Sequence, residues 1–206
     1  MTVVEERAGT AEAGTADAGT AAARRAMIDS QLRVSGINDM PILAAFLAVP
    51  REDFVPEARR AVAYADRAIV LDDGSVLAPA LTYGQMLTAA QPIADDTVLV
   101  IGAPGGYLAA LAEHLCDRVT LCAATGDWSA SSSHSLVLID GAIEDVPAAL
   151  AGVLTPEGRL VTGVVERGVT RLALGRKVGD ALVLTVLAEA DFAPLAAFAA
   201  RPQWSF

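Results

Sequence analysis

A glycine-rich segment in the middle of the chain has the composition of a ligand-binding loop. It reads Ile101-Gly102-Ala103-Pro104-Gly105-Gly106-Tyr107 and continues the apolar run that starts at Val98. Glycines let a backbone approach a bound molecule closely, and a helix that begins after the loop offers free N–H groups at its N-terminus. A strand before the loop and a helix after it are the context in which such a loop binds a ligand, but a plain strand-to-helix turn fits the same residues. The loop alone leaves both interpretations open.

Other side chains with reactive chemistry are few. The chain has two histidines, His114 and His134, and two cysteines, Cys116 and Cys122. These are too few for a His-rich metal cluster or a Cys-rich zinc site, so we assign no metal ligand. We expect His114 at the surface near the end of a helix, His134 exposed in a serine-rich loop, and the cysteines as small buried apolar groups rather than a redox pair.

Alternating apolar and amphipathic segments predict the elements that hold the loop. Val98–Ile101 is apolar throughout, as expected of a strand covered on both faces, and Tyr107–Cys116 has helical periodicity. Further strands are predicted at Val119–Cys122, Leu136–Ile139 and Arg159–Val165, with a helix around Val146–Leu154 and a hairpin of Thr170–Lys177 and Ala181–Ala188. This order predicts an α/β fold with a mainly parallel sheet that ends in an antiparallel hairpin.

The N-terminal region divides into a tail and a helical part. An AGTA-x pattern repeats from Ala8 to Ala22 without a large apolar side chain. Such a segment cannot offset roughly 1–2 kcal/mol of backbone entropy per residue, so we predict a flexible acidic tail over residues 1–22, although its alanines leave partial ordering against a partner open. Residues 23–206 then form one domain with a helical part over residues 23–66, whose helices are predicted from Ala22 to Gly36, from Asn38 or Asp39 to Pro50, and from Pro56 to Ala63.

Composition excludes several classes of protein. The chain has 206 residues and a net charge of −10, which suits one acidic domain and argues against a nucleic-acid or anionic-membrane surface. The longest uncharged run, Gly74–Ala94, contains two prolines and several polar residues, so we expect no membrane span. No secretory signal pattern is visible at the N-terminus, and we therefore expect a cytoplasmic protein.

Several blocks resemble the protein-L-isoaspartate O-methyltransferases, in the order that this family has them. Val98–Leu111 resembles the first S-adenosylmethionine motif of the family. The other blocks are Met27–Arg33, Val49-Pro50-Arg51-Glu52 with Phe54-Val55-Pro56, Ala63-Tyr64-Ala65-Asp66, Asp140-Gly141-Ala142 with Val146-Pro147, and Glu157-Gly158-Arg159-Leu160. The chain resembles a divergent and shortened member of this family.

The resemblance implies a three-layer, Rossmann-like class I methyltransferase fold with the N-terminal helices packed on the sheet. It implies methyl transfer from the sulfonium of S-adenosylmethionine to an isoaspartyl carboxylate. A carboxylate is already a nucleophile, so such an enzyme mainly aligns it and excludes water. If the cofactor pocket is retained, the matching residues are Gly102, Ala103, Gly106, Tyr107 and Asp140.

Departures from the family pattern fall in the cofactor and substrate regions. Val100 replaces an acidic residue of the first motif, and Pro104 replaces its second glycine. Cys122 stands where the family has an acidic acceptor for the ribose hydroxyls, and a thiol is a poor acceptor. The interval Ala123–Ser135 is too short for the helix and strand that the family has there, so a loop replaces part of the adenosine wall.

The substrate loop also departs from the pattern. Gly74–Pro79 is one residue shorter than its family counterpart, and it places Leu77 or Ala78 where the family has an active-site serine. Ser75 is either a displaced substitute or a solvated turn serine.

These observations lead to two main hypotheses. In the first, the chain has degenerate sites, no catalytic residue and no need of a cofactor, and acts as a binding protein or complex subunit. In the alternative, it is an active S-adenosylmethionine-dependent carboxyl methyltransferase acting on isoaspartyl residues of damaged proteins. A dinucleotide-binding oxidoreductase fits less well, because the acidic ribose-binding residue is missing. A protein partner would bind the N-terminal tail or the aromatic C-terminus, whose Phe192, Phe198, Trp204 and Phe206 otherwise pack in the core.

Overall fold

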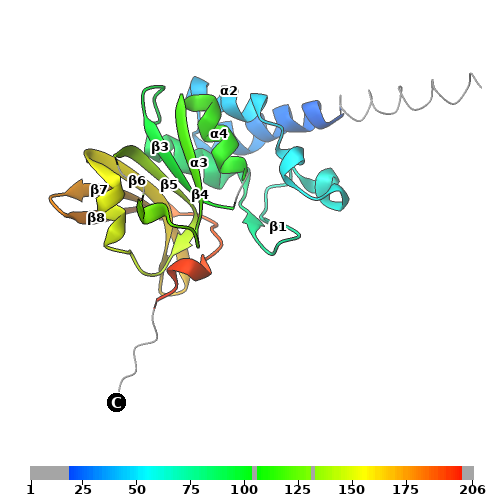
Figure 1. Ribbon diagram of the computed structural model, residues 1–206. Helices are drawn as coiled ribbons and strands as arrows, with labels where there is room; N and C mark the ends of the chain where they lie inside the picture. The colour runs from blue at the N-terminus through cyan, green and yellow to red at the C-terminus, as the bar shows by residue number, and fades with distance from the viewer. Residues whose placement is uncertain (1–18, 104–105, 131–132, 201–206) are drawn as a thin grey trace, which may run out of the picture.

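The computed structural model describes residues 19–103, 106–130 and 133–200. Its centre is a six-stranded sheet in the order β4-β3-β5-β6-β7-β8 (Figure 1). Four strands are parallel and two antiparallel strands follow at one edge. Their bounds are β3 Thr97–Gly102, β4 Arg118–Ala123, β5 His134–Ile143, β6 Leu154–Glu166, β7 Val169–Val178 and β8 Ala181–Glu189. The predicted α/β class, with its parallel sheet and C-terminal hairpin, is confirmed.

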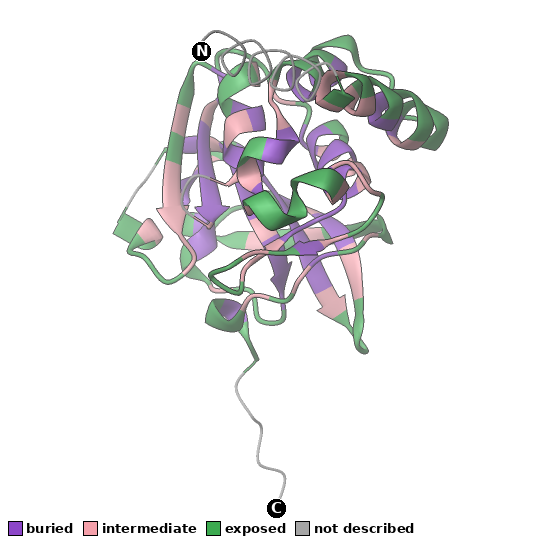
Figure 2. Ribbon diagram, turned by 90° about the vertical axis from the view of Figure 1, so that its right-hand side faces the viewer, coloured by how far each residue is buried: buried purple, intermediate pink, exposed green. Residues whose placement is uncertain are grey.

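Strand β3 carries core on both faces because its side chains alternate between two apolar clusters. Val98 and Val100 belong to one cluster, and Leu99 and Ile101 belong to the other; all four are at most 1% exposed. Figure 2 shows this as buried residues along the central strands, with exposed residues on the outer elements. The uninterrupted apolar run in the sequence therefore has the expected cause.

The two faces of the sheet are covered unequally. The helices α2 Met40–Ala48, α3 Ala80–Ala90 and α4 Tyr107–Leu115 contribute to the larger cluster, together with the N-terminal helical segment (Figure 1). In the part of the chain that the structure describes, the opposite face carries only short elements, namely α5 Ala149–Val153 and the 3₁₀ turns η5 Trp128–Ala130 and η6 Ala196–Phe198. No helix in the described ranges is long and apolar enough to cross a membrane.

Local signals explain most helix boundaries in the N-terminal part. Residues 19–27 are helical and continue into η1 Ile28–Leu32 and η2 Arg33–Ser35, which end at Gly36 with φ of 89°. Helix α2 starts at Asp39, whose carboxylate accepts a hydrogen bond from the backbone N–H of Ile42 at 3.1 Å. The short turns η3 Arg51–Phe54 and η4 Glu57–Val62 lead to the small hairpin of β1 Ile69–Val70 and β2 Val76–Leu77.

Some predictions were wrong in detail. Residues 19–22, predicted as tail, are helical; residues 1–18 lie outside the described residues. On α2 the apolar Leu47 is 46% exposed, whereas Ala45 belongs to the buried face of the helix. His134, predicted to be exposed, is buried, because strand β5 begins at this residue and pairs it with Leu154. The helix expected around Val146–Leu154 is only the five residues of α5, since β6 already begins at Leu154.

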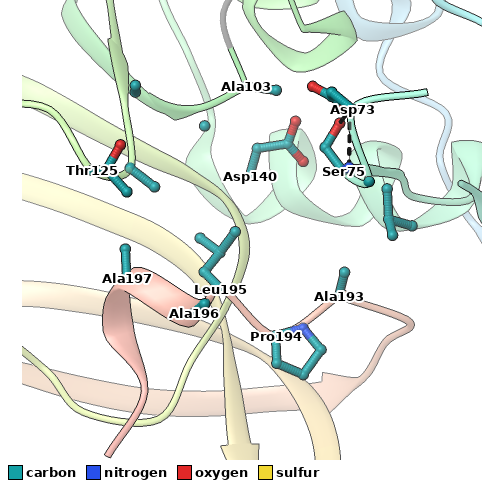
Figure 3. Close-up of a pocket in the computed structure, with 15 residues that line it drawn as sticks. Asp73, Ser75, Ala103, Thr125, Asp140, Ala193, Pro194, Leu195, Ala196 and Ala197 are labelled. Carbon is teal, nitrogen blue, oxygen red and sulfur yellow. Dashed lines mark hydrogen bonds between the residues drawn. The ribbon is translucent and has the colours of Figure 1, made fainter. Parts of the chain in front are cut away.

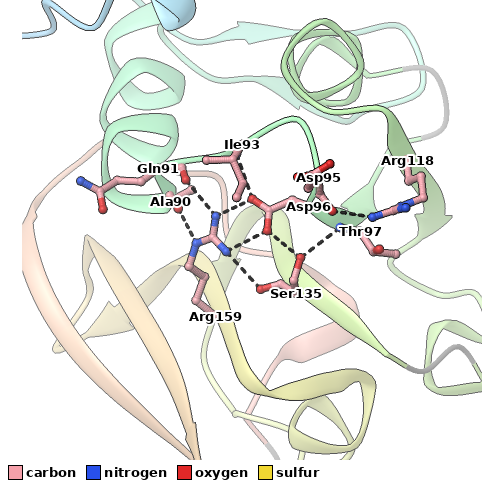
Figure 4. A network of polar contacts seen from close by, with 9 residues as sticks. All are labelled: Ala90, Gln91, Ile93, Asp95, Asp96, Thr97, Arg118, Ser135 and Arg159. Carbon is pink, nitrogen blue, oxygen red and sulfur yellow. Dashed lines mark hydrogen bonds and ion pairs between the residues drawn. The ribbon is translucent and has the colours of Figure 1, made fainter.

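A buried ion pair fixes the amino-terminal ends of the parallel strands. Arg159 of β6 donates two hydrogen bonds to the Asp96 carboxylate, Nη2 to Oδ2 at 2.7 Å and Nη1 to Oδ1 at 3.1 Å (Figure 4). Asp96 also accepts from the Ser135 hydroxyl at 2.6 Å and from the Ile93 N–H at 3.0 Å. The network ties three segments together at the edge of the sheet where β3 begins.

A second cluster of polar side chains, formed by Arg24, Glu52 and Tyr64, shows what Glu52 of the family-like block contacts. Arg24 donates from Nη2 to Glu52 at 2.9 Å and from Nε to the Tyr64 hydroxyl at 2.8 Å, and Tyr64 in turn donates to Glu52. These contacts hold the N-terminal helix against the segments that follow α2. The role of Glu52 in this fold is structural.

Candidate functional site

A cleft opens at the carboxyl ends of β3, β4 and β5, which is where open α/β sheets bind ligands (Figure 3). Its larger cavity has a volume of about 560 Å³, within the range of small-molecule sites. The lining consists of the turn Asp73–Val76, the ends of β3 and β4, Asp140 of β5 and the C-terminal segment Ala193–Ala197.

A smaller cavity of about 360 Å³ extends the cleft toward the helical part. The two cavities share Asp73, Ser75, Val76, Ala103 and Asp140, so they form one continuous cleft. The smaller cavity reaches the aromatic residues at the base of α3 and α4, and its further lining residues include Phe54, Tyr83 and Tyr107.

The five residues that match the family's cofactor positions all line this cleft. Gly102 is the last residue of β3, Ala103 follows it, and Gly106 and Tyr107 begin α4. Asp140 reaches the same place from β5. The structure therefore brings the predicted residues together, while Pro104 and Gly105 of the same loop lie outside the described residues. Their role in holding a cofactor stays a prediction.

An irregularity in β5 directs Asp140 into the cleft. The pairing of β5 with β6 shifts register between Leu138 and Ala142, and Gly141 between them has φ of 151°. Such irregularities bend a strand and re-aim its side chains. A Cβ atom on Gly141 would lie 2.5 Å from Leu195, so only glycine fits here. Figure 3 shows the Asp140 carboxylate pointing into the space between the Ser75 turn and Leu195.

The environment of Asp140 disfavours its charged form. Burial raises the pKa of this carboxyl to about 6, although a hydrogen bond from Tyr83 and the charge of Arg51 act in the opposite direction. The Tyr83 hydroxyl donates to Oδ2 over 3.5 Å, a long contact. The cost of burial therefore exceeds the stabilisation that the surrounding residues supply.

Arg51 lies beneath the cleft and was not predicted as a site residue. It is fully buried, with Nε donating to the Ala63 carbonyl at 2.8 Å and Nη2 to the Ala78 carbonyl at 2.6 Å. Its guanidinium carbon lies 5.9 Å from the Tyr83 ring centroid and 5.3 Å from that of Tyr107. Its burial lowers its pKa. Its place in the family-like block Val49–Pro56, where Glu52 and Asp53 are also charged, was the only sequence signal for it.

On the substrate side, the structure separates the three candidate positions. Leu77 and Ala78 are buried, and the backbone N–H of Ala78 donates to the Tyr83 hydroxyl at 3.1 Å. Ser75 lines the cleft, but its hydroxyl donates to Asp73 at 2.6 Å within a turn. Ser75 is thus a turn serine that also faces the cleft.

Among the described residues, the side of the cleft near β4 is lined without a carboxylate. Val100 is 1% exposed and packs in the core, and Cys122 packs partly against the second apolar cluster. The cleft is lined there by Ala123, Ala124 and Thr125. Between β4 and β5 the described residues include only the short turn η5, and β4 is the edge of the sheet. The charged acceptor for the ribose hydroxyls of S-adenosylmethionine, which the family resemblance implies at the end of β4, is thus missing from the described lining.

The C-terminal segment closes the cleft from the other side. Ala142 donates to the Ala193 carbonyl and accepts from the Leu195 N–H, both at 2.8 Å. Phe192 and Phe198 are buried, and Phe198 stacks on Trp128 with 5.8 Å between ring centroids. Core packing is confirmed for these two phenylalanines, whereas Trp204 and Phe206 lie outside the described residues.

The remaining reactive side chains lie apart from this arrangement. His114 is exposed on α4, as predicted. Cys116 is buried and Cys122 half-buried, and both are free thiols. Neither of the histidines and neither of the cysteines lines the cleft.

Comparison with known protein sequences shows the family of the chain. A model of the protein-L-isoaspartate(D-aspartate) O-methyltransferase family matches residues 22–126. The chain belongs to this family. A protein-L-isoaspartate O-methyltransferase of Koribacter versatilis is 31% identical over 199 residues, covering 84% of this chain and 90% of the relative. A second relative of the same name, from Roseiflexus sp., is 33% identical, and the match covers 84% of this chain and 91% of the relative.

Solved structures of the isoaspartate methyltransferase family share the fold. One superposes with a TM-score of 0.71 at 20% identity, covering 84% of this chain and 66% of the other. A second is described as a putative protein-L-isoaspartate O-methyltransferase from Plasmodium falciparum in complex with S-adenosyl-L-homocysteine. It superposes with a TM-score of 0.69 at 13% identity, and the match covers 84% of this chain and 98% of the other. The family match ends at residue 126, between β4 and β5.

Proposed function

We propose that this isoaspartate methyltransferase homologue does not transfer methyl groups and that its cleft serves binding, in a non-catalytic protein or complex subunit. The observation that supports this is the end of β4, where Cys122 and two alanines stand in place of a charged acceptor. A second acidic position of the family holds the buried Val100.

The expected loss of cofactor affinity is large. A hydrogen bond to a charged group contributes roughly 1.5–3 kcal/mol, so two missing carboxylates remove roughly 3–6 kcal/mol. Each 1.4 kcal/mol is a factor of ten in the dissociation constant, so a cofactor that would otherwise bind with a micromolar constant would bind roughly 10²–10⁴-fold more weakly. Such a protein would be largely free of S-adenosylmethionine at micromolar concentrations.

A second candidate function is methyl transfer to isoaspartyl carboxylates. Relatives of that name match this chain over about 90% of their own length. The absence of a base does not count against it, because a carboxylate nucleophile is already ionised at neutral pH. The two candidates differ in whether the cofactor binds.

Calorimetric titration with S-adenosylmethionine and S-adenosyl-L-homocysteine separates them, with the Koribacter versatilis relative as positive control. We expect dissociation constants at least a hundredfold weaker than those of the control. Transfer of a labelled methyl group to an isoaspartyl peptide should be at background. Micromolar binding together with labelled peptide would overturn the proposal and establish the second candidate.

A binding role also requires a partner surface. We propose the N-terminal tail, residues 1–18, or the aromatic C-terminus with Trp204 and Phe206 as the attachment to a partner protein. Affinity purification with the full chain and with chains lacking residues 1–18 or 201–206 tests this. A partner retained by the full chain and by both shortened chains would contradict it.

A further inference from the structure

The charged side chains of the cleft all have the same sign. Among the described residues that line its two cavities there is no Lys, Arg or His, while four carboxylates do so: Asp53, Asp72, Asp73 and Asp140. Asp72 and Asp73 are exposed at the mouth, and Asp140 lies at the floor. An anionic ligand would meet like charge throughout this cleft, whereas a cationic ligand would meet opposite charge.

Asp140 lacks a strong partner in the fold. The only described residue that donates a hydrogen bond to it is Tyr83, over 3.5 Å. Arg51 acts on Asp140 through its charge alone, because its two paired nitrogens donate to the backbone carbonyls of Ala63 and Ala78 rather than to Asp140. Asp140 is half-buried and faces the cleft, so its carboxylate is left available to a ligand.

A second, independent feature of the cleft points to a ligand. Tyr107 is 0% exposed, yet its hydroxyl has no hydrogen-bond partner among the described residues, and a phenolic oxygen can accept from an ammonium or guanidinium N–H. Tyr107 lines the smaller cavity directly. Buried polar groups without partners are rare in a packed core and are found where a ligand or an ordered water completes the site.

The walls above Asp140 are apolar. Val76, Leu77, Pro194 and Leu195 line the two cavities beside it. An aliphatic chain would bury its methylene groups against these walls while placing a charged end on the carboxylate. Lysine-like and arginine-like groups have this combination of stem and charge.

We propose that the cleft binds an ammonium or guanidinium group on an aliphatic stem, with Asp140 as its counter-ion at the floor and Asp73 at the mouth. The inference rests on the proposed function, because the cleft is then free of S-adenosylmethionine. The same chemistry occurs in small diamines and in basic side chains of a peptide. The charges that favour these ligands disfavour the isoaspartyl carboxylate of the family reaction.

Calorimetric titration of the full chain at pH 7.5 and low salt tests the proposal. The probes are 1,5-diaminopentane and N-acetyl-lysine amide, with N-acetyl-norleucine amide as the uncharged analogue of the same stem. We expect at least one of the two amines to bind at least tenfold more tightly than the norleucine compound. Binding of the diamine alone identifies a small-molecule source, and binding of the lysine amide identifies a peptide source. Equal binding of the norleucine compound, or no binding of either amine, would overturn the proposal.

Variants locate the binding. Asp140→Asn should weaken the affinity for the amine at least tenfold. Asp73→Asn should weaken it by a smaller factor, because Asp73 is exposed at the mouth of the cleft. The amide oxygen of Asp73→Asn can still accept the hydrogen bonds from Ser75, so the turn should be preserved. The matched control is Glu157→Gln, which removes one exposed carboxylate at the other edge of the sheet and should leave affinity unchanged. Equal losses in Asp140→Asn and Glu157→Gln would show that only net charge matters and would overturn the assignment of Asp140.

The pH dependence gives a readout that needs no variant. Groups facing Asp140 are Arg51, Tyr83 and Asp73, and Arg51 and the amine ligand remain protonated below neutral pH. Amine affinity should therefore fall as pH drops through about 6, where Asp140 takes up a proton. An affinity that stays constant between pH 5 and 8 would contradict the assignment of Asp140. Titration with S-adenosyl-L-homocysteine in parallel shows separately whether the proposed function has failed.

Discussion

Gly102 and Asp140 lie so close together, on the neighbouring strands β3 and β5, that a Cβ atom on Gly102 would sit 2.8 Å from the Cβ of Asp140. The first glycine of the loop thus makes room for the acidic side chain that faces the cleft. A position that the sequence assigned to cofactor approach is required here for packing between two strands.

Gly102→Ala should therefore disturb the cleft floor. We expect a loss of about 1–3 kcal/mol in the free energy of unfolding, because the methyl group must displace Asp140 or the backbone of β5. Urea denaturation monitored by circular dichroism measures it. Gly152→Ala is the control, since nothing lies within 4 Å of the methyl group that alanine would add in helix α5, and the substitution there should be neutral or stabilising. Equal effects of the two substitutions would refute the packing argument.

The Asp96–Arg159 pair should dominate the polar contribution to stability. Asp96 is 4% exposed in its side chain, so Arg159→Ala leaves a buried carboxylate without its cation and should cost about 3–5 kcal/mol. Arg171→Ala removes two exposed pairs, with Glu166 and Glu189, and should cost less than about 1 kcal/mol. Denaturant midpoints of the two variants compare them directly, and a smaller loss for Arg159→Ala than for Arg171→Ala would contradict the prediction.

The same pair predicts an acid limit of stability. Burial alone would raise the pKa of Asp96, but hydrogen bonds from Arg159 and Ser135 outweigh it and lower the pKa overall. A lowered pKa contributes stability that is present above the unfolded value of about 4 and is lost as pH falls through the folded value. The denaturant midpoint of the wild type should thus decrease as the pH is lowered below about 4, and the decrease should be smaller in Arg159→Ala. An equal decrease in both would remove Asp96 as the cause.

The sequence carried enough information for the sheet and the glycine loop, but not for the cleft floor. Val98–Ile101 is apolar on both faces, and that pattern has few interpretations other than a covered strand. Helix α3 was missed because it is buried around much of its surface and contains Gly84, so it shows no polar face. Arg51 was missed as a site residue because its burial depends on Tyr83 and Tyr107, which are remote in sequence.

Asp140 predicts a second pH effect of opposite sign. Its folded pKa of about 6 lies above the unfolded value, so the folded state binds more protons between about pH 4 and 6 and stability should decrease as pH rises through this window. A shift of two units corresponds to roughly 2–3 kcal/mol. Asp140→Asn should abolish this slope and be at least as stable as wild type at pH 7.5, as measured by urea denaturation at several pH values. A variant that is less stable at pH 7.5 would show that the carboxylate is needed by Arg51.

Restoring a carboxylate at the end of β4 should restore part of the lost cofactor affinity. Ala123 lines the cleft at the end of β4, next to Cys122, whose side chain packs against the second apolar cluster, so Ala123→Asp supplies a charged acceptor for ribose hydroxyls. One such hydrogen bond is worth roughly 1.5–3 kcal/mol, which predicts about a 10–100-fold gain in affinity for S-adenosyl-L-homocysteine by calorimetry. Ala123→Asn provides a neutral side chain of the same shape and should gain less than Ala123→Asp. An equal affinity in wild type and both variants would mean that the ribose side does not limit binding, and the shortened wall after β4 would then be the main cause.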